Sequence, residues 1–355
     1  MLVRSLGRVA AIGAFALVFG YGLLGLAVQT AEAVPLPRVL QPAPGDFDAR
    51  WFNPGAGGVR FHPDWLWELR PGAHILQLDV NDDGYCGPIA STSRGETFRI
   101  AVLSDAFALA LGLAQEVAWP RLLESLLRTN GIDAEVLNFA VPAFTVAQGR
   151  RLYGGRVREY APDLVIAAFG AVQECEPATG GGSDLVRLER ARKWRTRSEM
   201  FLERSSTLRW CLRKLGLPRP PRDVGDVRRL SRTEFAGELS ALAADVRSDG
   251  HRVALVSPPR LQLLERDRPE LSEYDHVIHR VARERAIALV EVHDKVRSVQ
   301  PDVDTPDHLP LGDRMFHDAH ALTNEGSFAY AALVARSLVE HHLVPVAENG
   351  GGELR

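Results

Sequence analysis

The chain has 355 residues, of which 46% are hydrophobic and 25% charged, so it holds ample apolar material for a folded core. Its formal net charge of −3 gives no general reason to expect a nucleic-acid partner. The three cysteines, Cys86, Cys175 and Cys211, match no metal-ligand spacing and are too few for a disulfide framework. One disulfide in an oxidising compartment and three unpaired thiols both remain open.

The N-terminus has the three parts of a secretory signal. Arg4 and Arg8 precede an uncharged apolar run from Val9 to Val28, and the small-x-small sequence Ala31-Glu32-Ala33 follows. At about 1.5 Å per residue, a helix over this run is long enough to span a bilayer of about 30 Å. Residues 1–33 therefore predict either a cleaved signal peptide or an uncleaved inner-membrane anchor. In both cases we expect the rest of the chain to be exported, to the periplasm or the extracellular space.

The remainder divides by composition into four parts. Residues 34–58 contain five prolines and a glycine-rich run without periodicity, which predicts a linker. Residues 59–97 predict a short β-rich lead-in. Trp65 and Trp67 are expected there as core residues; platforms for a sugar are the alternative. Residues 98–343 predict the main domain, and residues 344–355 a flexible tail.

Within the main domain, apolar runs typical of strands alternate with helix-like periodicity. We expect strands at 99–103, 134–139, 164–169, 252–256 and 287–292. The first strand is followed by a sharp turn at 104–106 and then a helix, and further helices are expected near 119–128, 147–159 and 324–342. Thr323 is the expected N-cap of the last helix. This alternation predicts a three-layer α/β/α fold around a five-stranded parallel sheet.

A basic segment interrupts the alternation at about 184–232. It contains fifteen Lys or Arg against six Asp or Glu, and follows the glycines at 180–182. We interpret it as a helical insertion with a solvated charged face; contact with an anionic membrane or polysaccharide is the alternative.

Several short motifs, in order over five strands, resemble those of the SGNH (GDSL) hydrolases, from residue 98 to about 338. They are Ser104-Asp105-Ala106, Trp119-Pro120, Asn138, Pro142, Gln148, Pro162-Asp163-Leu164-Val165, Ser257-Pro258-Pro259 and Leu322-Thr323-Asn324-Glu325-Gly326. The resemblance implies a flavodoxin-like sheet and an exported bacterial esterase that works by acyl transfer. In that chemistry a Ser attacks an ester, a His activates the Ser, an Asp orients the His, and donors stabilise the oxyanion.

Compared position by position, the resemblance implies a catalytic site from which several of the family's functional residues are absent. Ala106 stands at the nucleophile position, where a methyl group cannot attack a carbonyl. Ala143 stands at the oxyanion glycine, which keeps its backbone N–H, and Val172 stands at the oxyanion Asn, where it has no donor to give. The orienting residue is retained as Asp318, but Ala321 occupies the position of the base.

Two residues that lie close to the expected catalytic positions offer an alternative base and an alternative nucleophile. His320 lies one residue before the base position, and Ser104 lies two residues before the nucleophile position, where the geometry disfavours it as a substitute. A metal held by His317, Asp318 and His320 is disfavoured because three ligands within four residues of a loop are sterically awkward. We therefore expect neither a metal nor a cofactor.

The sequence thus supports two function classes. The first is an exported pseudoenzyme that binds an acyl ester, an acetylated glycan or an envelope protein. The second is an active esterase or acyl transferase on acyl esters that uses displaced residues such as Ser104 and His320. Contact with the membrane is expected only through residues 9–28, if these are not cleaved.

Overall fold

The computed structural model describes residues 58–75, 77–93, 95–170, 172–178, 182–192, 227–260, 262–293, 295, 315–316 and 322–345. The expected signal or anchor, the linker up to residue 57 and the tail beyond residue 345 lie outside them. So do residues 193–226 of the basic insertion, which contain Cys211. Among the described helices, none is both long and apolar enough to cross a membrane.

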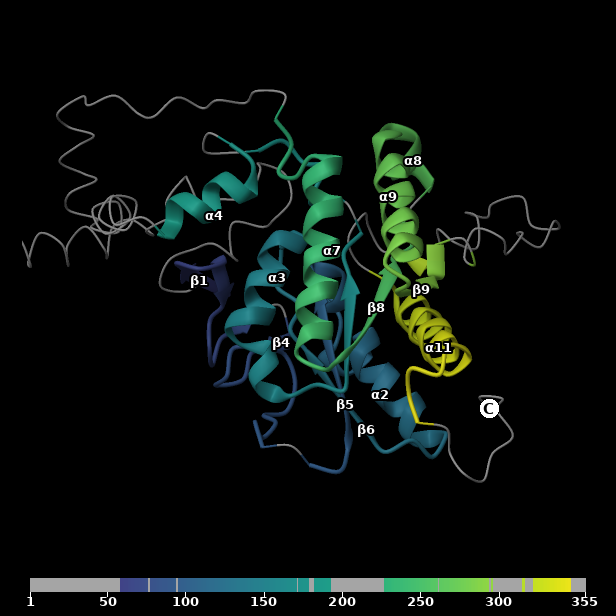
Figure 1. The fold of residues 1–355 in the computed structure, drawn as a ribbon. Coiled ribbons are helices and arrows are strands. Elements are labelled where there is room, and N and C mark those ends of the chain that lie inside the picture. The colour runs from purple at the N-terminus through teal and green to yellow at the C-terminus, as the bar shows by residue number, and fades with distance from the viewer. Residues whose placement is uncertain are drawn as a thin grey trace, which may run out of the picture.

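Five parallel strands form the central sheet (Figure 1). When the strands are numbered by their order along the chain, their order across the sheet is 2-1-3-4-5. This is the flavodoxin-like order, so the predicted fold class is confirmed. Each central strand reads as an almost continuous apolar run because it is buried on both faces. From one edge to the other the strands are β6 (Ala134–Asn138), β5 (Phe98–Ser104), β7 (Leu164–Ala168), β8 (Arg252–Ser257) and β9 (Ala288–Glu291).

Helices cover the two faces of this sheet (Figure 1). On one face α2 (Trp119–Thr129) packs against α11 (Asn324–Glu340). On the other, α7 (Arg232–Ser248) packs between α3 (Val146–Gly155) and α9 (Glu270–Glu284). The shorter α4 (Asp184–Arg192) contacts α3, and α8 (Gln262–Asp267) contacts α9. The three predicted layers are therefore present.

Two of the expected helices differ from the structure. After β5 the chain makes a 3₁₀ turn at Ala106–Ala108 and no α-helix, because positive φ angles at Ala110 (51°) and Gly112 (82°) break the helical path. The helix expected at 147–159 ends at Gly155, and a 3₁₀ turn at Val157–Tyr160 follows. The adjacent Gly154 and Gly155 explain that early end, since glycine weakens a helix.

The lead-in packs on the main domain through its first hairpin, which pairs β1 (Val59–His62) with β2 (Leu66–Leu69). Trp65 and Trp67 are both buried, as expected of core residues. The indole Nε1 of Trp67 donates to the carbonyl of Pro142 at 2.9 Å, and Gln148 Nε2 donates to the carbonyl of Trp65 at 3.1 Å. A second hairpin pairs β3 (His74–Ile75) with β4 (Leu78–Asp79).

The start of α11 depends on a glycine. Thr323 is its N-cap, as predicted, and Thr323 Oγ1 accepts from the N–H of Gly326 at 3.0 Å. A Cβ at Gly326 would lie 2.1 Å from the carbonyl oxygen of Met315, which is backbone and cannot rotate away. The last helix and the segment that begins at Met315 therefore meet at a point where only glycine fits.

We expect Gly326→Ala to lower the free energy of unfolding by about 1–3 kcal/mol, because overpacking against backbone forces a shift. The matched control is Gly237→Ala in α7, where a Cβ meets nothing within 4 Å. Alanine there should raise stability by about 0.4–1 kcal/mol. Urea unfolding measures whether the free energy of unfolding falls in Gly326→Ala and rises in Gly237→Ala. Equal changes in the two variants would contradict the steric argument.

Candidate functional site

The candidate site lies at the carboxyl ends of β5 and β7. The strand order reverses at β5, and in open α/β sheets ligands bind in the crevice at that point. Ala106 follows β5, Val172 follows β7, and the structure brings both into the wall of one cavity. Two of the predicted site positions therefore meet where the sheet topology places a ligand.

The turn after β5 is built by its polar residues. Asp105 caps the 3₁₀ turn by accepting from the N–H of Phe107 at 3.0 Å, and Ala106 is 3% exposed. Ser104 is buried, and its Oγ donates to the carbonyl of Ala168 on β7 at 2.8 Å. The Ser104 hydroxyl thus joins two strands of the sheet, and Ser104 is not among the residues that line the cavity.

The cavity beside Ala106 is small. Its volume is about 20 Å³, which is room for one water, whereas small-molecule sites commonly enclose about 300–1,000 Å³. It is lined by Asp105, Ala106, Phe107, Gly170, Val172, Pro258, Pro259 and Arg260.

Ala143 has a strained backbone conformation, and a buried arginine donates a hydrogen bond to its carbonyl. Its φ of 58° is in the left-handed region, which favours glycine, the residue that the resemblance implies at this position. The carbonyl of Ala143 accepts from Arg229 Nη2 at 2.8 Å. Ala143 therefore adopts a left-handed conformation with a Cβ present.

The segment that carries Asp318, His320 and Ala321 lies outside the described residues, so the structure does not place these three positions. Its two flanks are described. The N–H of Thr323 donates to the carbonyl of Met315 at 2.7 Å, and Phe316 pairs with Leu322 across a β-bridge. The ring of Phe316 lies 6.3 Å from that of Phe107, centroid to centroid. The described residues on either side of 317–321 are thus held together beside the turn that carries Ala106.

Sequence reasoning missed the buried ion-pair network around Arg229. Arg229 Nη2 lies 2.7 Å from Asp184 Oδ2 and donates to Gln148 Oε1 at 3.0 Å, and Arg229 Nη1 donates to Gln173 Oε1 at 3.1 Å. Asp184 also pairs with Arg187 at 2.7 Å. Burial alone would raise the pKa of Asp184, but the two guanidinium groups outweigh it and the pKa is lowered. Both arginines belong to the basic segment that we expected to be solvated, and both are fully buried, which corrects that interpretation for them.

Glu174 adds a carboxyl group with an unusual pKa to this region. It is buried, and its Oε1 accepts from the N–H of Val146 at the start of α3, at 3.0 Å. Burial raises the pKa of Glu174 to about 8, and the nearby charge of Asp105 adds to the rise, against the Val146 N–H and Arg229. The region therefore holds one carboxyl that favours its neutral form near pH 7.

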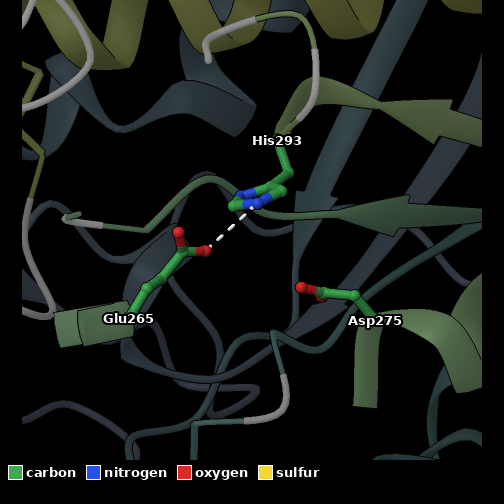
Figure 2. A group of neighbouring side chains, drawn as sticks. All are labelled: Glu265, Asp275 and His293. Carbon is green, nitrogen blue, oxygen red and sulfur yellow. Dashed lines mark ion pairs between the residues drawn. The ribbon is translucent and has the colours of Figure 1, made fainter. Parts of the chain in front are cut away.

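Glu265, Asp275 and His293 form the one group in the described part of the chain with the residue types and spacing of a metal site (Figure 2). Their possible ligand atoms lie within 4.8 Å of one another, and His293 Nε2 is 3.1 Å from Glu265 Oε1. However, the guanidinium of Arg260 already lies between the carboxylates: it forms an ion pair with Asp275 and reaches Glu265 at 3.4 Å. A metal ion would have to displace this buried cation, so the group fits an ion-pair cluster better than a metal centre. Arg260 Nη1 also donates to the carbonyl of Gly170 at 3.0 Å, which links the cluster to the cavity wall.

No protein-family model matches the chain, and no curated protein matches it either. Similar solved structures exist. The lipase/acylhydrolase from Enterococcus faecalis is 15% identical, with a TM-score of 0.45, over 68% of this chain and 94% of that one. A GDSL-like lipase from Bacteroides thetaiotaomicron is 12% identical, with a TM-score of 0.42, over 71% and 93%. A catalytic mutant of an acetylxylan esterase from Geobacillus stearothermophilus is 13% identical, with a TM-score of 0.43, over 69% and 95%.

At such identities and TM-scores the likeness carries no argument about activity or substrate. The sheet order and the meeting of Ala106 with Val172 are properties of this chain's own structure. In fold, the protein resembles the SGNH (GDSL) hydrolases, as its sequence motifs predicted.

Proposed function

We propose that this chain is an exported SGNH-type pseudoenzyme that binds a glycan, an acyl ester or a protein partner in the cell envelope without hydrolysing an ester. The observation that carries the proposal is the methyl group of Ala106 in the wall of the cavity at the sheet's switch point. Export rests on residues 1–33, which carry the positive flank, apolar run and small-x-small site of a secretory signal.

The surroundings of Ala106 support the loss of hydrolysis. Val172 lines the same cavity and offers no donor to an oxyanion; losing one such donor commonly costs about 10²–10³ in rate. Ser104, the displaced alternative, donates its hydroxyl to the carbonyl of Ala168 and does not line the cavity. Each of these features removes something that acyl transfer needs.

The test is hydrolysis of p-nitrophenyl acetate by the purified full-length chain. We expect no turnover above the buffer rate and no labelling by a fluorophosphonate probe, because no Ser, Thr or Cys side chain lines the cavity among the described residues. Turnover that Ser104→Ala abolishes would contradict the proposal. It would favour the alternative, an active esterase or acyl transferase that uses Ser104 and His320.

Restoring the family residues provides the reciprocal test. The triple variant Ala106→Ser, Val172→Asn, Ala321→His should gain turnover, at least about 10²-fold above Ala106→Ser alone, since the single variant has neither base nor Asn donor. Steady-state rates on the same substrate measure this gain. A triple variant no faster than the single one would show that these positions do not form the family's site.

A further inference from the structure

A tight turn lies just before α3, at the edge of the candidate site. The N–H of Phe144 donates to the carbonyl of Val141 at 3.2 Å, which closes a four-residue turn with Pro142 and Ala143 in the middle. The N–H of Val141 donates in turn to the carbonyl of Ser104 at 3.1 Å, at the end of β5. The conformation of this turn therefore bears on the candidate site.

The turn is of type II, although alanine stands where that type favours glycine. Its second residue is Pro142, whose ring fixes φ near about −65°, and its third is Ala143, with a φ of 58°. In a type I turn the third residue has a negative φ, so the two types differ by a flip of the central peptide, which carries the Pro142 carbonyl and the Ala143 N–H. Type II crowds that carbonyl against the Cβ of the third residue, so alanine by itself favours type I.

A hydrogen bond from the lead-in hairpin holds the less favoured type. Trp67 is fully buried, and its Nε1 donates to the carbonyl of Pro142 at 2.9 Å. A flip would turn this carbonyl away from the indole and break the bond, which is costly in a protein interior. Two other bonds survive a flip because they do not involve the central peptide: the one that closes the turn, and the one from Arg229 Nη2 to the carbonyl of Ala143. Of these three bonds, the one from Trp67 distinguishes the two turn types.

The indole ring is held in place by parts of the chain outside the turn. Trp67 belongs to β2, and the guanidinium groups of Arg187 and Arg229 each lie 5.8 Å from the centroid of its ring. Contacts of this kind between a cation and an aromatic face are attractive. The hairpin and the two ends of the basic insertion therefore aim Nε1 at the turn.

The N–H of Ala143 does not itself stabilise type II. Ala143 is buried, and its N–H has no acceptor among the residues that the structure describes. A buried N–H without a partner is rare because it costs free energy. The groups of the turn thus do not explain its type, whereas the bond from Trp67 does.

We propose that Trp67 is a positioning residue that selects the type II orientation of the peptide between Pro142 and Ala143, so that the lead-in hairpin controls this loop of the candidate site. With the indole in place, the Ala143 N–H points away from Nε1, because the carbonyl and N–H of one trans peptide point in opposite directions. Loss of the indole bond lets the peptide flip to type I, which reverses the N–H. The inference does not depend on whether the site hydrolyses an ester.

NMR spectroscopy of the full-length chain in detergent micelles reports the orientation of this peptide. The chain has three Pro–Ala pairs, at 42–43, 142–143 and 177–178, so labelling with ¹³C proline and ¹⁵N alanine selects three amides. The signal that Ala143→Gly removes is that of Ala143. In a type II turn the Hα of Pro142 lies close to the Ala143 N–H and gives a strong nuclear Overhauser effect (NOE), whereas a flip to type I separates the two hydrogens. We expect the strong NOE in the original chain, and its absence there would overturn the proposal.

Variants test the part played by the indole. Trp67→Phe keeps an aromatic ring and removes the donor, so we expect it to lose the NOE. The matched control is Trp119→Phe, which should keep the NOE, because Nε1 of Trp119 is buried without an acceptor in the described part of the chain. An unchanged NOE in Trp67→Phe, or an equal loss in Trp119→Phe, would overturn the proposal.

A rescue variant separates the turn from general packing. Adding Ala143→Gly to Trp67→Phe should bring back at least part of the NOE, now observed with ¹⁵N glycine, since glycine accepts a positive φ without crowding. No recovery would contradict the role of the Cβ. Melting temperatures show which variants fold, and Trp67→Tyr, which fills more of the volume of the indole, takes the place of Trp67→Phe if that variant does not.

Discussion

Replacing Arg229 by alanine is expected to lower the free energy of unfolding by about 3–5 kcal/mol, the usual cost of removing one partner of a buried ion pair. Arg229 and Asp184 are both fully buried, with 2.7 Å between Nη2 and Oδ2. Without Arg229, the Asp184 carboxylate keeps Arg187 as its one charged partner among the described residues, and the carbonyl of Ala143 loses this donor. Both losses leave polar atoms buried away from water.

Urea unfolding followed by circular dichroism measures this effect. The matched control is Arg232→Ala, since Arg232 pairs with Glu273 on the surface, where the two side chains are 58% and 51% exposed. An exposed pair is worth at most about 1 kcal/mol, so the control should lose far less stability. Arg229→Lys keeps the charge but loses the planar set of N–H groups, so we expect it to retain part of the stability. It provides the measurement if the alanine variant does not fold. Equal losses in Arg229→Ala and Arg232→Ala would contradict the buried network.

The same network explains how the chain enters and leaves the basic insertion. Asp184 lies before residues 193–226, and Arg229 lies after them. The N–H of Asp184 donates to the carbonyl of Arg229 at 2.7 Å, and the N–H of Arg229 donates to that of Glu176 at 2.8 Å. A buried ion pair and backbone hydrogen bonds thus join the two ends of the insertion next to the carboxyl end of β7. From there Arg229 Nη2 donates to the carbonyl of Ala143, so the attachment of the insertion also supports the strained backbone at Ala143.

The strands were predictable because of where they lie. All five residues of β7 are buried and apolar, and a strand covered on both faces must read as a continuous apolar run. The helix expected after β5 was wrong because apolar residues continue through the turn while Ala110 and Gly112 have positive φ angles. Periodicity does not report a backbone angle that tertiary packing imposes.

The site was predictable only in part. Motif order placed Ala106 and Val172 together, since both follow neighbouring strands of a parallel sheet. Arg229 and Asp184 are 45 residues apart in a segment rich in charge, and nothing in the local sequence separates a buried arginine from a solvated one. Pairings of this kind depend on contacts between distant segments, which a single sequence does not encode as a pattern.

Glu174 gives the second large expected effect, on the dependence of stability on pH. Its pKa is about 8 in the folded protein, against an ordinary value of 4.5. Between these two values the folded state holds a proton that the unfolded state has released, so the contribution of Glu174 is fully present below about pH 4.5 and is lost as pH rises through 8. The free energy of unfolding should therefore fall across this window through Glu174, by up to about 1.4 kcal/mol per pH unit.

Glu174→Gln removes the titration while keeping the shape of the neutral side chain. We expect the variant and the original chain to have similar stability near pH 5, where Glu174 is protonated, and the variant to be the more stable one at pH 9. Urea unfolding of both proteins at one-unit steps from pH 5 to 9 measures the difference, in which the titration of other groups cancels. A difference that stays constant, or that changes in the opposite direction, would contradict the buried neutral carboxyl. Since Asp105 lines the cavity and its charge raises the pKa of Glu174, the same titration reports the electrostatics of the site around Ala106.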